Sequence, residues 1–284
     1  MSSGHARPRA LITGASAGIG TAYAERLARD GYDVVLVARR RERLEELAAR
    51  LQRETGGRAE VLAADLTDAK ALGRVEARVA DDEALALVVN NAGFGAYRPF
   101  AEVEPAVIDS LINIHIRAVA RLTRAALPGM IRRGSGGIIN VASLLALSGS
   151  IPANPQPLHG AVAPAHPPLP YRATYAGAKA FIVVFTEALA GELTGTGVRV
   201  QACLPGMVAT EFHTVQGMDA SNRPRMAAAD VVTASLAALA RGEVVCVPSL
   251  GDPEPIARLT EVQREVLRSA FTPVLARRYQ PGNT

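Results

Sequence analysis

The sequence predicts an α/β fold: a Rossmann-type, doubly wound sheet of seven mostly parallel strands with helices on both faces, in a single domain. Short apolar runs alternate with longer amphipathic stretches along the chain, and a glycine-rich turn follows the first run. The chain has 284 residues, 49% of them hydrophobic, which is enough to bury one large core. We expect this domain over residues 8–250, with a C-terminal extension over residues 251–284 that packs on the substrate side or forms a subunit contact.

The expected elements follow this alternation in order. Strands are expected at residues 10–12, 34–37, 60–63, 85–89, 137–141, 198–203 and 244–247. Most of these runs are apolar on both faces, as in a parallel sheet covered by helices. Helical periodicity predicts helices at residues 19–29, 41–53, 69–80, 105–132, 175–193, 229–240 and about 256–270. Ligands of such sheets bind at the carboxyl ends of the strands.

The glycine-rich turn, residues 13–20, follows the first strand and opens the first helix, the context in which it can cradle a dinucleotide. Gly14 permits the tight turn, Gly18 a close approach of the pyrophosphate, and Gly20 close packing of the helix. After the second strand, Arg39 and Arg40 stand where NAD-binding chains have a carboxylate. Because an arginine fork suits a 2′-phosphate, we expect NADP(H), with Arg39 as the first contact and Ser16 as a helper. Two arginines that begin a solvated helix are the alternative.

Bulk properties exclude several other classes of function. The net charge is only +4 and basic residues are mixed with acidic ones, so we expect no nucleic-acid partner. No apolar run is long enough to span a membrane and the N-terminus lacks a signal peptide, so we expect a cytoplasmic protein without a membrane partner. Cys203 and Cys246 are expected to be buried free thiols. His159 and His166 lack nearby ligands, so we expect no metal site.

A tyrosine and a lysine, Tyr175 and Lys179, lie one helical turn apart and share a face. A lysine held beside a phenol is expected to lower the pKa of the tyrosine, which would then exchange protons near neutral pH. Ser143 can offer a hydrogen bond to an oxygen on which negative charge develops. This set predicts catalysis of hydride transfer to or from a nicotinamide.

With these motifs in order, the chain resembles the short-chain dehydrogenase/reductase family from residue 10 to about residue 247. The matching motifs are TGxxxGxG at residues 13–20, NNAG at 90–93, YxxxK at 175–179 and the Pro-Gly pair at 205–206. The resemblance implies catalytic roles for Ser143, Tyr175, Lys179 and Asn113, the last supporting a water-linked proton relay to the lysine. It implies that the cofactor is bound by Gly14, Ser16, Gly18, Ile19, Gly20, Arg39, Arg40, Asp65, Leu66, Asn91, Ala92, Gly93, Tyr175, Lys179, Pro205, Gly206, Val208 and Thr210.

Some of these implied roles are specific. Asp65 would bond the adenine amino group, Thr210 would contact the carboxamide side of the cofactor, and Asn90 and Gly93 would hold the fourth strand against the cofactor. The resemblance also implies a homodimer or homotetramer.

The sequence departs from the family between the catalytic serine and tyrosine. Tyr175 follows Ser143 by 32 positions, where relatives have about a dozen, and residues 148–170 hold seven of the 18 prolines. Such a segment is neither a long helix nor a central strand. We interpret residues 149–167 as an insertion at the rim of the site. A lid or wall, a plain surface excursion and a subunit contact remain alternatives.

The expected activity is NADP(H)-dependent reduction of a ketone or aldehyde on a medium or bulky apolar small molecule, with Tyr175 as proton donor. Residues 94–97, 144–147, 171 and 207–218 are expected on the substrate side, and most of them are apolar. The alternatives are an NAD-dependent alcohol dehydrogenase and a non-catalytic NADP(H)-binding regulatory or scaffold protein. The sequence does not identify the substrate, its stereochemistry or the number of subunits.

Overall fold

The computed structural model describes residues 7–153, 169–216 and 223–280 of the chain. Most of the interpreted insertion, residues 149–167, therefore lies outside the described residues. The chain forms two compact units, one over residues 1–248 and one over residues 249–284.

The sheet of the first unit has seven strands in the order β3-β2-β1-β4-β5-β6-β7, and every neighbouring pair is parallel. This confirms the predicted fold class. The strands are β1 (Arg9–Thr13), β2 (Asp33–Ala38), β3 (Ala59–Ala63), β4 (Leu85–Asn90), β5 (Gly136–Val141), β6 (Val198–Cys203) and β7 (Val245–Cys246). The order reverses between β1 and β4, so a ligand crevice is expected above the carboxyl ends of these two strands.

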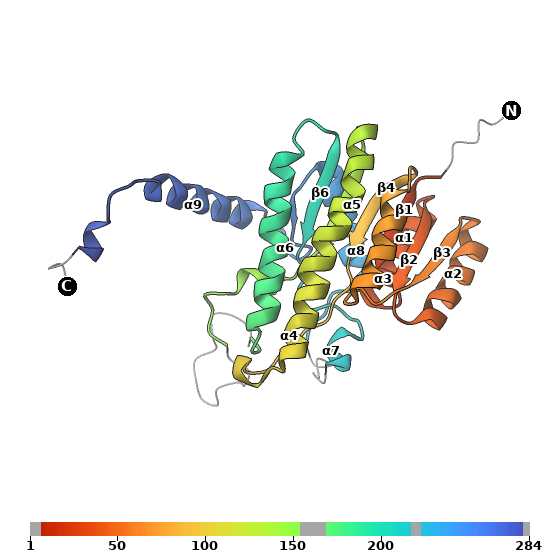
Figure 1. Ribbon diagram of the computed structural model, residues 1–284, viewed down its shortest axis with the longest axis horizontal. Helices are drawn as coiled ribbons and strands as arrows, with labels where there is room; N and C mark the ends of the chain where they lie inside the picture. The colour runs from red at the N-terminus through yellow and green to blue at the C-terminus, as the bar shows by residue number, and fades with distance from the viewer. Residues whose placement is uncertain (1–6, 154–168, 217–222, 281–284) are drawn as a thin grey trace. The chain divides into compact units, whose positions relative to one another are not determined.

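Helices cover both faces of the sheet (Figure 1). The helices of the described residues are α1 (Gly18–Arg29), α2 (Arg41–Thr55), α3 (Ala69–Ala80), α4 (Pro105–Ile112), α5 (Ala118–Arg133), α6 (Ala173–Glu192), α7 (Phe212–Val215), α8 (Ala228–Arg241) and α9 (Glu254–Ala270). Helices α1, α2 and α8 share one core cluster with the sheet, whereas α3, α5 and α6 share another on the opposite face. Successive residues of β1 show why: Ile12 joins the first cluster and Leu11 the second.

The helix predicted over residues 105–132 is interrupted in its middle. Helices α4 and α5 are joined by a π-helical turn at Asn113–Arg117, which the predicted regular helix did not include. Such a turn inserts an extra residue and changes which side chains face inward beyond it. Here it buries His115, which is 1% exposed.

Helix α6 is long and apolar enough to cross a membrane by length and composition, the one such helix in the described part of the chain. Of its apolar window, 39% is buried, and it packs on β5 and β6. A core helix of a globular protein meets the same criteria.

Cys203 and Cys246 are buried free thiols on the neighbouring strands β6 and β7, as predicted.

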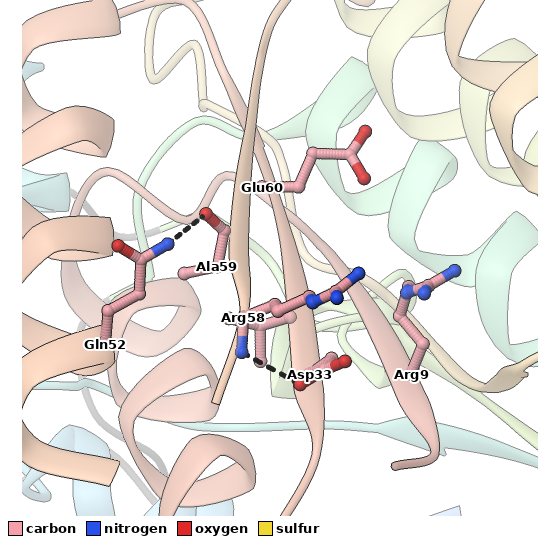
Figure 2. Close-up of a pocket in the computed structure, with 7 residues that line it drawn as sticks. Arg9, Asp33, Gln52, Arg58, Ala59 and Glu60 are labelled. Carbon is pink, nitrogen blue, oxygen red and sulfur yellow. Dashed lines mark hydrogen bonds between the residues drawn. The ribbon is translucent and has the colours of Figure 1, made fainter. Parts of the chain in front are cut away.

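A shallow pocket lies at the amino ends of the first three strands (Figure 2). Its polar side chains are used structurally: the Arg58 backbone N–H donates to Asp33 Oδ1 at 2.8 Å, and the Gln52 amide donates to the Ala59 carbonyl at 3.2 Å. Since ligands of doubly wound sheets bind at the opposite, carboxyl edge, this pocket is not the candidate site.

Candidate active site

The glycine-rich turn leads from β1 into α1 with a backbone that requires glycine. Gly14 and Gly18 have φ of +69° and +57°, which side chains rarely adopt. A Cβ on Gly20 would lie 2.2 Å from the Gly14 carbonyl oxygen, so the start of α1 packs directly on the turn. The turn and the free N–H groups at the start of α1 fit the pyrophosphate of a dinucleotide.

The turn is fastened to the segment after β4. Thr13 Oγ1 accepts the backbone N–H groups of Asn91 and Ala92 at 2.9 and 3.0 Å. The Asn91 side-chain amide donates to the Thr13 carbonyl at 3.0 Å. These bonds fix the two loops on either side of the strand-order reversal.

Asn90, which is predicted to hold the fourth strand against the cofactor, binds the neighbouring elements through its side chain. Its amide donates to Asn140 Oδ1 at 2.9 Å and to Thr123 Oγ1 at 3.2 Å. Asn140 in turn donates to Thr186 Oγ1 at 3.0 Å. This buried chain joins β4, β5, α5 and α6 and thereby fixes the strand end that precedes Ser143.

The structure brings Ser143, Tyr175 and Lys179 together at the carboxyl end of β5. Ser143 caps a short 3₁₀ turn at Leu144–Leu147 by accepting the Leu145 N–H at 3.2 Å, and its hydroxyl acts to lower the pKa of Tyr175. Tyr175 and Lys179 are 5% and 4% exposed on the inner face of α6. Lys179 Nζ lies 5.7 Å from the centroid of the Tyr175 ring and donates to the Val141 carbonyl at 2.7 Å.

The expected lowering of the pKa of Tyr175 by Lys179 is not found. Burial raises the pKa of Tyr175 to about 12, although hydrogen bonds with Ser143 and Tyr97 oppose this shift. Burial also lowers the pKa of Lys179 to about 7. The ammonium loses its water on entering the core, so Lys179 is only partly protonated near neutral pH.

Two further aromatic side chains complete this end of the site. Tyr97 lies against Tyr175 with their ring centroids 5.5 Å apart, and its hydroxyl acts to lower the pKa of Tyr175. The His115 ring meets the Tyr175 ring edge-on at 5.6 Å, and its Nε2 lies 2.7 Å from the Phe94 carbonyl oxygen. Because that oxygen only accepts, Nε2 carries the proton and Nδ1 is a buried acceptor with no partner among the residues that the structure describes.

Sequence reasoning placed Tyr97 near the substrate but missed His115. A regular helix puts His115 on a different face from Asn113, whereas the π-helical turn points it inward. Burial, followed by the charge of Lys179, holds the pKa of His115 well below its usual range. Asn113 opens the same turn and is half-buried; its carbonyl accepts the Ala118 N–H.

At the nucleotide end, Arg40 rather than Arg39 lies beside Ser16. The Arg40 Nε and Nη2 groups donate to Ser16 Oγ at 3.1 and 3.0 Å. Arg39 is exposed, with no hydrogen bond or ion pair to the described residues. Glu211, from the segment after β6, binds both Arg40 and Arg43.

The other predicted cofactor residues surround the same crevice. The Pro205 carbonyl accepts the Leu144 N–H at 3.0 Å, which ties the Pro205–Gly206 turn to the Ser143 segment. The Thr210 side chain lies over Gly18, where an added Cβ would be 2.9 Å from it. Gly93 lies against the His115 ring.

Three of the predicted cofactor residues have side chains directed into the protein. Leu66 and Val208 belong to the two core clusters, and Ile19 packs on one of them. Asp65 Oδ1 accepts from the backbone and hydroxyl of Thr67 at 2.9 and 2.8 Å. Leu66, Val208 and Ile19 would therefore contact a cofactor through their backbone.

His159 and His166, which are predicted not to bind a metal, lie in the part of the proline-rich segment outside the described residues. Among the residues that the structure describes, no group of three or more His, Cys, Asp or Glu side chains can hold a metal ion. The ends of the segment are tied by buried Arg172, which donates to the Ser148 hydroxyl and carbonyl, each at 2.7 Å, and to the Pro170 carbonyl at 3.0 Å.

Comparison with known proteins identifies the family. A family model described as short chain dehydrogenase matches residues 8–154 and 162–220. The chain belongs to the short chain dehydrogenase family. This confirms the resemblance seen in the sequence.

A very-long-chain 3-oxoacyl-CoA reductase of Anas platyrhynchos is 32% identical over 211 residues, 72% of this chain and 61% of that relative. The chain thus spans about three fifths of the length of such curated relatives.

Two solved structures cover nearly the whole chain. A short-chain dehydrogenase from Sphingobium yanoikuyae, in complex with NADPH, has a TM-score of 0.86 and 33% identity and covers 96% of this chain and 100% of its own. The bulky-bulky ketone specific alcohol dehydrogenase from Comamonas testosteroni has a TM-score of 0.83 and 31% identity, with 96% and 99% covered. The enzyme class predicted from the motifs, a short-chain oxidoreductase, matches the names of these relatives.

Proposed function

We propose that the protein is an NADP(H)-dependent oxidoreductase that reduces a ketone or aldehyde on a medium or bulky apolar molecule, with Tyr175 as proton donor. The observation that carries this proposal is the buried Tyr175 at the carboxyl edge of the sheet, whose pKa the Ser143 and Tyr97 hydroxyls lower against the effect of burial. Lys179 lies beside it on the same helix face.

The protonation states favour the reductive direction. With a pKa of about 12, Tyr175 is a phenol at neutral pH and can donate its proton to a carbonyl oxygen. Ser143 can donate a hydrogen bond to the same oxygen as charge develops there. Lys179, with a pKa of about 7, exchanges protons at neutral pH and can help to restore the phenol. Asn113 would support that relay.

The residues of the crevice fit a dinucleotide. The bare backbone of Gly14 and Gly18 leaves room that a Cβ would fill, and α1 offers free N–H groups. NADP(H) supplies or accepts the hydride when bound. Arg40, held at Ser16, is the residue best placed for a 2′-phosphate. The Sphingobium yanoikuyae relative, solved with NADPH, supports the same preference.

The substrate class follows from apolar side chains around Tyr175. The Phe212 ring lies 6.3 Å from the Tyr175 ring, and Phe94 lies 6.3 Å from His115. The named activities of two relatives, on a bulky-bulky ketone and on a 3-oxoacyl-CoA, are both carbonyl chemistry. Residues 149–167 would form an insertion that shapes access to this end.

The test is a titration of the purified protein with NADPH and NADH, followed by NADPH oxidation across a panel of ketones and aldehydes. We expect tighter binding of NADPH and turnover of bulky apolar ketones. Preference for NADH would overturn the cofactor assignment. If wild type binds NADPH as tightly as Tyr175→Phe does and, like that variant, turns over no carbonyl, the regulatory or scaffold alternative would be favoured.

We further propose a cytoplasmic homodimer or homotetramer that uses the α4–α5–α6 face. Ile112, Ile131 and Val184 on these helices are 41%, 43% and 62% exposed, and a second copy of the chain would cover this apolar surface. The extension over residues 251–284 would add a subunit contact or cover the substrate side. Sedimentation of the whole chain, compared with a Val184→Glu variant, tests the face: an unchanged mass would contradict it.

A further inference from the structure

An ion-pair cluster spans the nucleotide end of the site, and its centre is Glu211. One carboxylate oxygen lies 2.5 Å from Arg40 Nη1, and the other lies 2.9 Å from Arg43 Nη1. The remaining Arg40 donors, Nε and Nη2, bind Ser16 Oγ. Two hydrogen-bonding edges of the Arg40 guanidinium are therefore occupied, one by Ser16 of the glycine-rich turn and one by Glu211.

Glu211 belongs to a segment that reaches both ends of the site. The preceding residue, Thr210, lies over Gly18 of the glycine-rich turn. The following residue, Phe212, begins α7, and its ring lies 6.3 Å from that of Tyr175. The Glu211 ion pairs thus anchor the segment beside the reacting tyrosine to α2 at the nucleotide end.

A carboxylate on a guanidinium occupies the donors that a phosphate would use. A 2′-phosphate carries more charge and more acceptor oxygens than one carboxylate, so it can replace Glu211 on Arg40. A 2′-hydroxyl has no charge and cannot. The ion pairs are half-exposed, with 40%, 36% and 50% exposure for Arg40, Glu211 and Arg43, so their exchange costs little.

We propose that Glu211 is a specificity-determining residue that occupies Arg40 and Arg43 and gives way to the 2′-phosphate of NADP(H). This inference rests on the proposed NADP(H) preference. It adds that phosphate binding releases residues 210–212 from α2, whereas NAD(H) leaves the ion pairs intact. Removing the carboxylate therefore strengthens NADP(H) binding selectively.

The experiment measures the affinity of the whole protein for NADPH, NADH, 2′,5′-ADP and 5′-ADP by calorimetry, in wild type, Glu211→Gln and Glu211→Ala. Glu45→Gln is the matched control, since Glu45 forms an exposed ion pair with Arg41 at 3.4 Å on α2, the helix that also carries Arg43. We expect both Glu211 variants to bind NADPH and 2′,5′-ADP about three- to tenfold more tightly, with NADH and 5′-ADP unchanged. The control should change none of these affinities, and added salt should reduce the gain.

The outcomes separate this inference from the proposed function. If wild type prefers NADPH but the Glu211 variants bind it equally or more weakly, Glu211 only organises the arginines and the inference is overturned. If the variants gain affinity for NADH as much as for NADPH, Glu211 acts on the shared part of the cofactor and the inference fails as well. If wild type prefers NADH, the proposed cofactor preference falls, and the inference with it.

Discussion

At the nucleotide end of the candidate site, glycines and backbone groups form most of the binding surface, whereas buried side chains form the reacting end. Gly14 and Gly18 have positive φ, and Thr13 Oγ1 accepts hydrogen bonds from the backbone N–H groups of Asn91 and Ala92. At the other end, the rings of Tyr97, His115 and Phe212 surround Tyr175. The first end depends on local conformation and the second on how distant elements pack.

This difference predicts which property a single substitution at each end of the site should change. A change at the nucleotide end should alter cofactor affinity or the fold of the turn. A change at the reacting end should alter turnover or proton uptake while the cofactor still binds. The following predictions test this separation, from the largest expected effect to the smallest.

The first prediction concerns the proton donor. Tyr175→Phe removes the hydroxyl but keeps the ring that packs against its neighbours. We expect kcat to fall about 10²- to 10⁴-fold, because the substitution removes the group that donates the proton to the substrate oxygen. NADPH affinity, measured by fluorescence titration, should stay the same. Tyr32→Phe, remote from the site, is the control, and a loss of binding in Tyr175→Phe would show that the two ends are not separable.

The second prediction breaks the nucleotide end. Gly20→Ala would place a Cβ 2.2 Å from the Gly14 carbonyl oxygen and 2.6 Å from Asn91 Nδ2, so the turn must move. We expect NADPH binding to be lost and the melting temperature to fall. Gly73→Ala on α3 is the control, since its Cβ would meet no atom of the described residues within 4 Å beyond its chain neighbours and the backbone of its own helix. It should stabilise the protein by about 0.5–1 kcal/mol, and full NADPH affinity in Gly20→Ala would refute the packing argument.

The third prediction concerns the pH dependence of stability. Lys179 has a pKa of about 7 in the fold and 10.5 as its usual value, so the unfolded chain binds more protons between these values. Stability should therefore rise with pH in this window, and below it the cost of burying the charge is constant. We expect the free energy of unfolding of wild type, relative to Lys179→Met, to increase by about 2 kcal/mol from pH 7 to pH 9.

Chemical denaturation at each pH measures this difference. Tyr175, with a pKa of about 12, titrates above the window, and the pKa of His115 lies below it. If the difference in free energy of unfolding between wild type and Lys179→Met does not change with pH, Lys179 keeps its proton in the folded protein. Neighbouring groups would then stabilise its buried charge.

The fourth prediction sharpens the reacting end. His115→Phe keeps a flat ring against Tyr175 but leaves the Phe94 carbonyl without its donor. We expect a destabilisation of about 1–2 kcal/mol and a lower kcat, because the loop that carries Tyr97 loses its tie to the π-helical turn at Asn113–Arg117. NADPH affinity should be unchanged. His115→Gln, which can donate to the same carbonyl, should recover part of both losses; an equal loss in both variants would indicate a packing role alone.

The sequence by itself determined the fold class, the strand and helix order, and the motif residues that converge at the carboxyl edge of the sheet. Apolar periodicity and glycine patterns are local properties, and they fix local conformation. Even so, β7 is two residues long where four were expected, because strand ends depend on pairing with a neighbour.

Only the tertiary structure decided the electrostatics and the partners of the site. The pKa of Tyr175 follows from burial, which no spacing of Tyr175 and Lys179 reveals. The inward position of His115 depends on a π-helical turn, and the pairing of Arg40 with Glu211 joins residues 171 positions apart. These features arise from desolvation and long-range packing, and they exist only once the chain has folded.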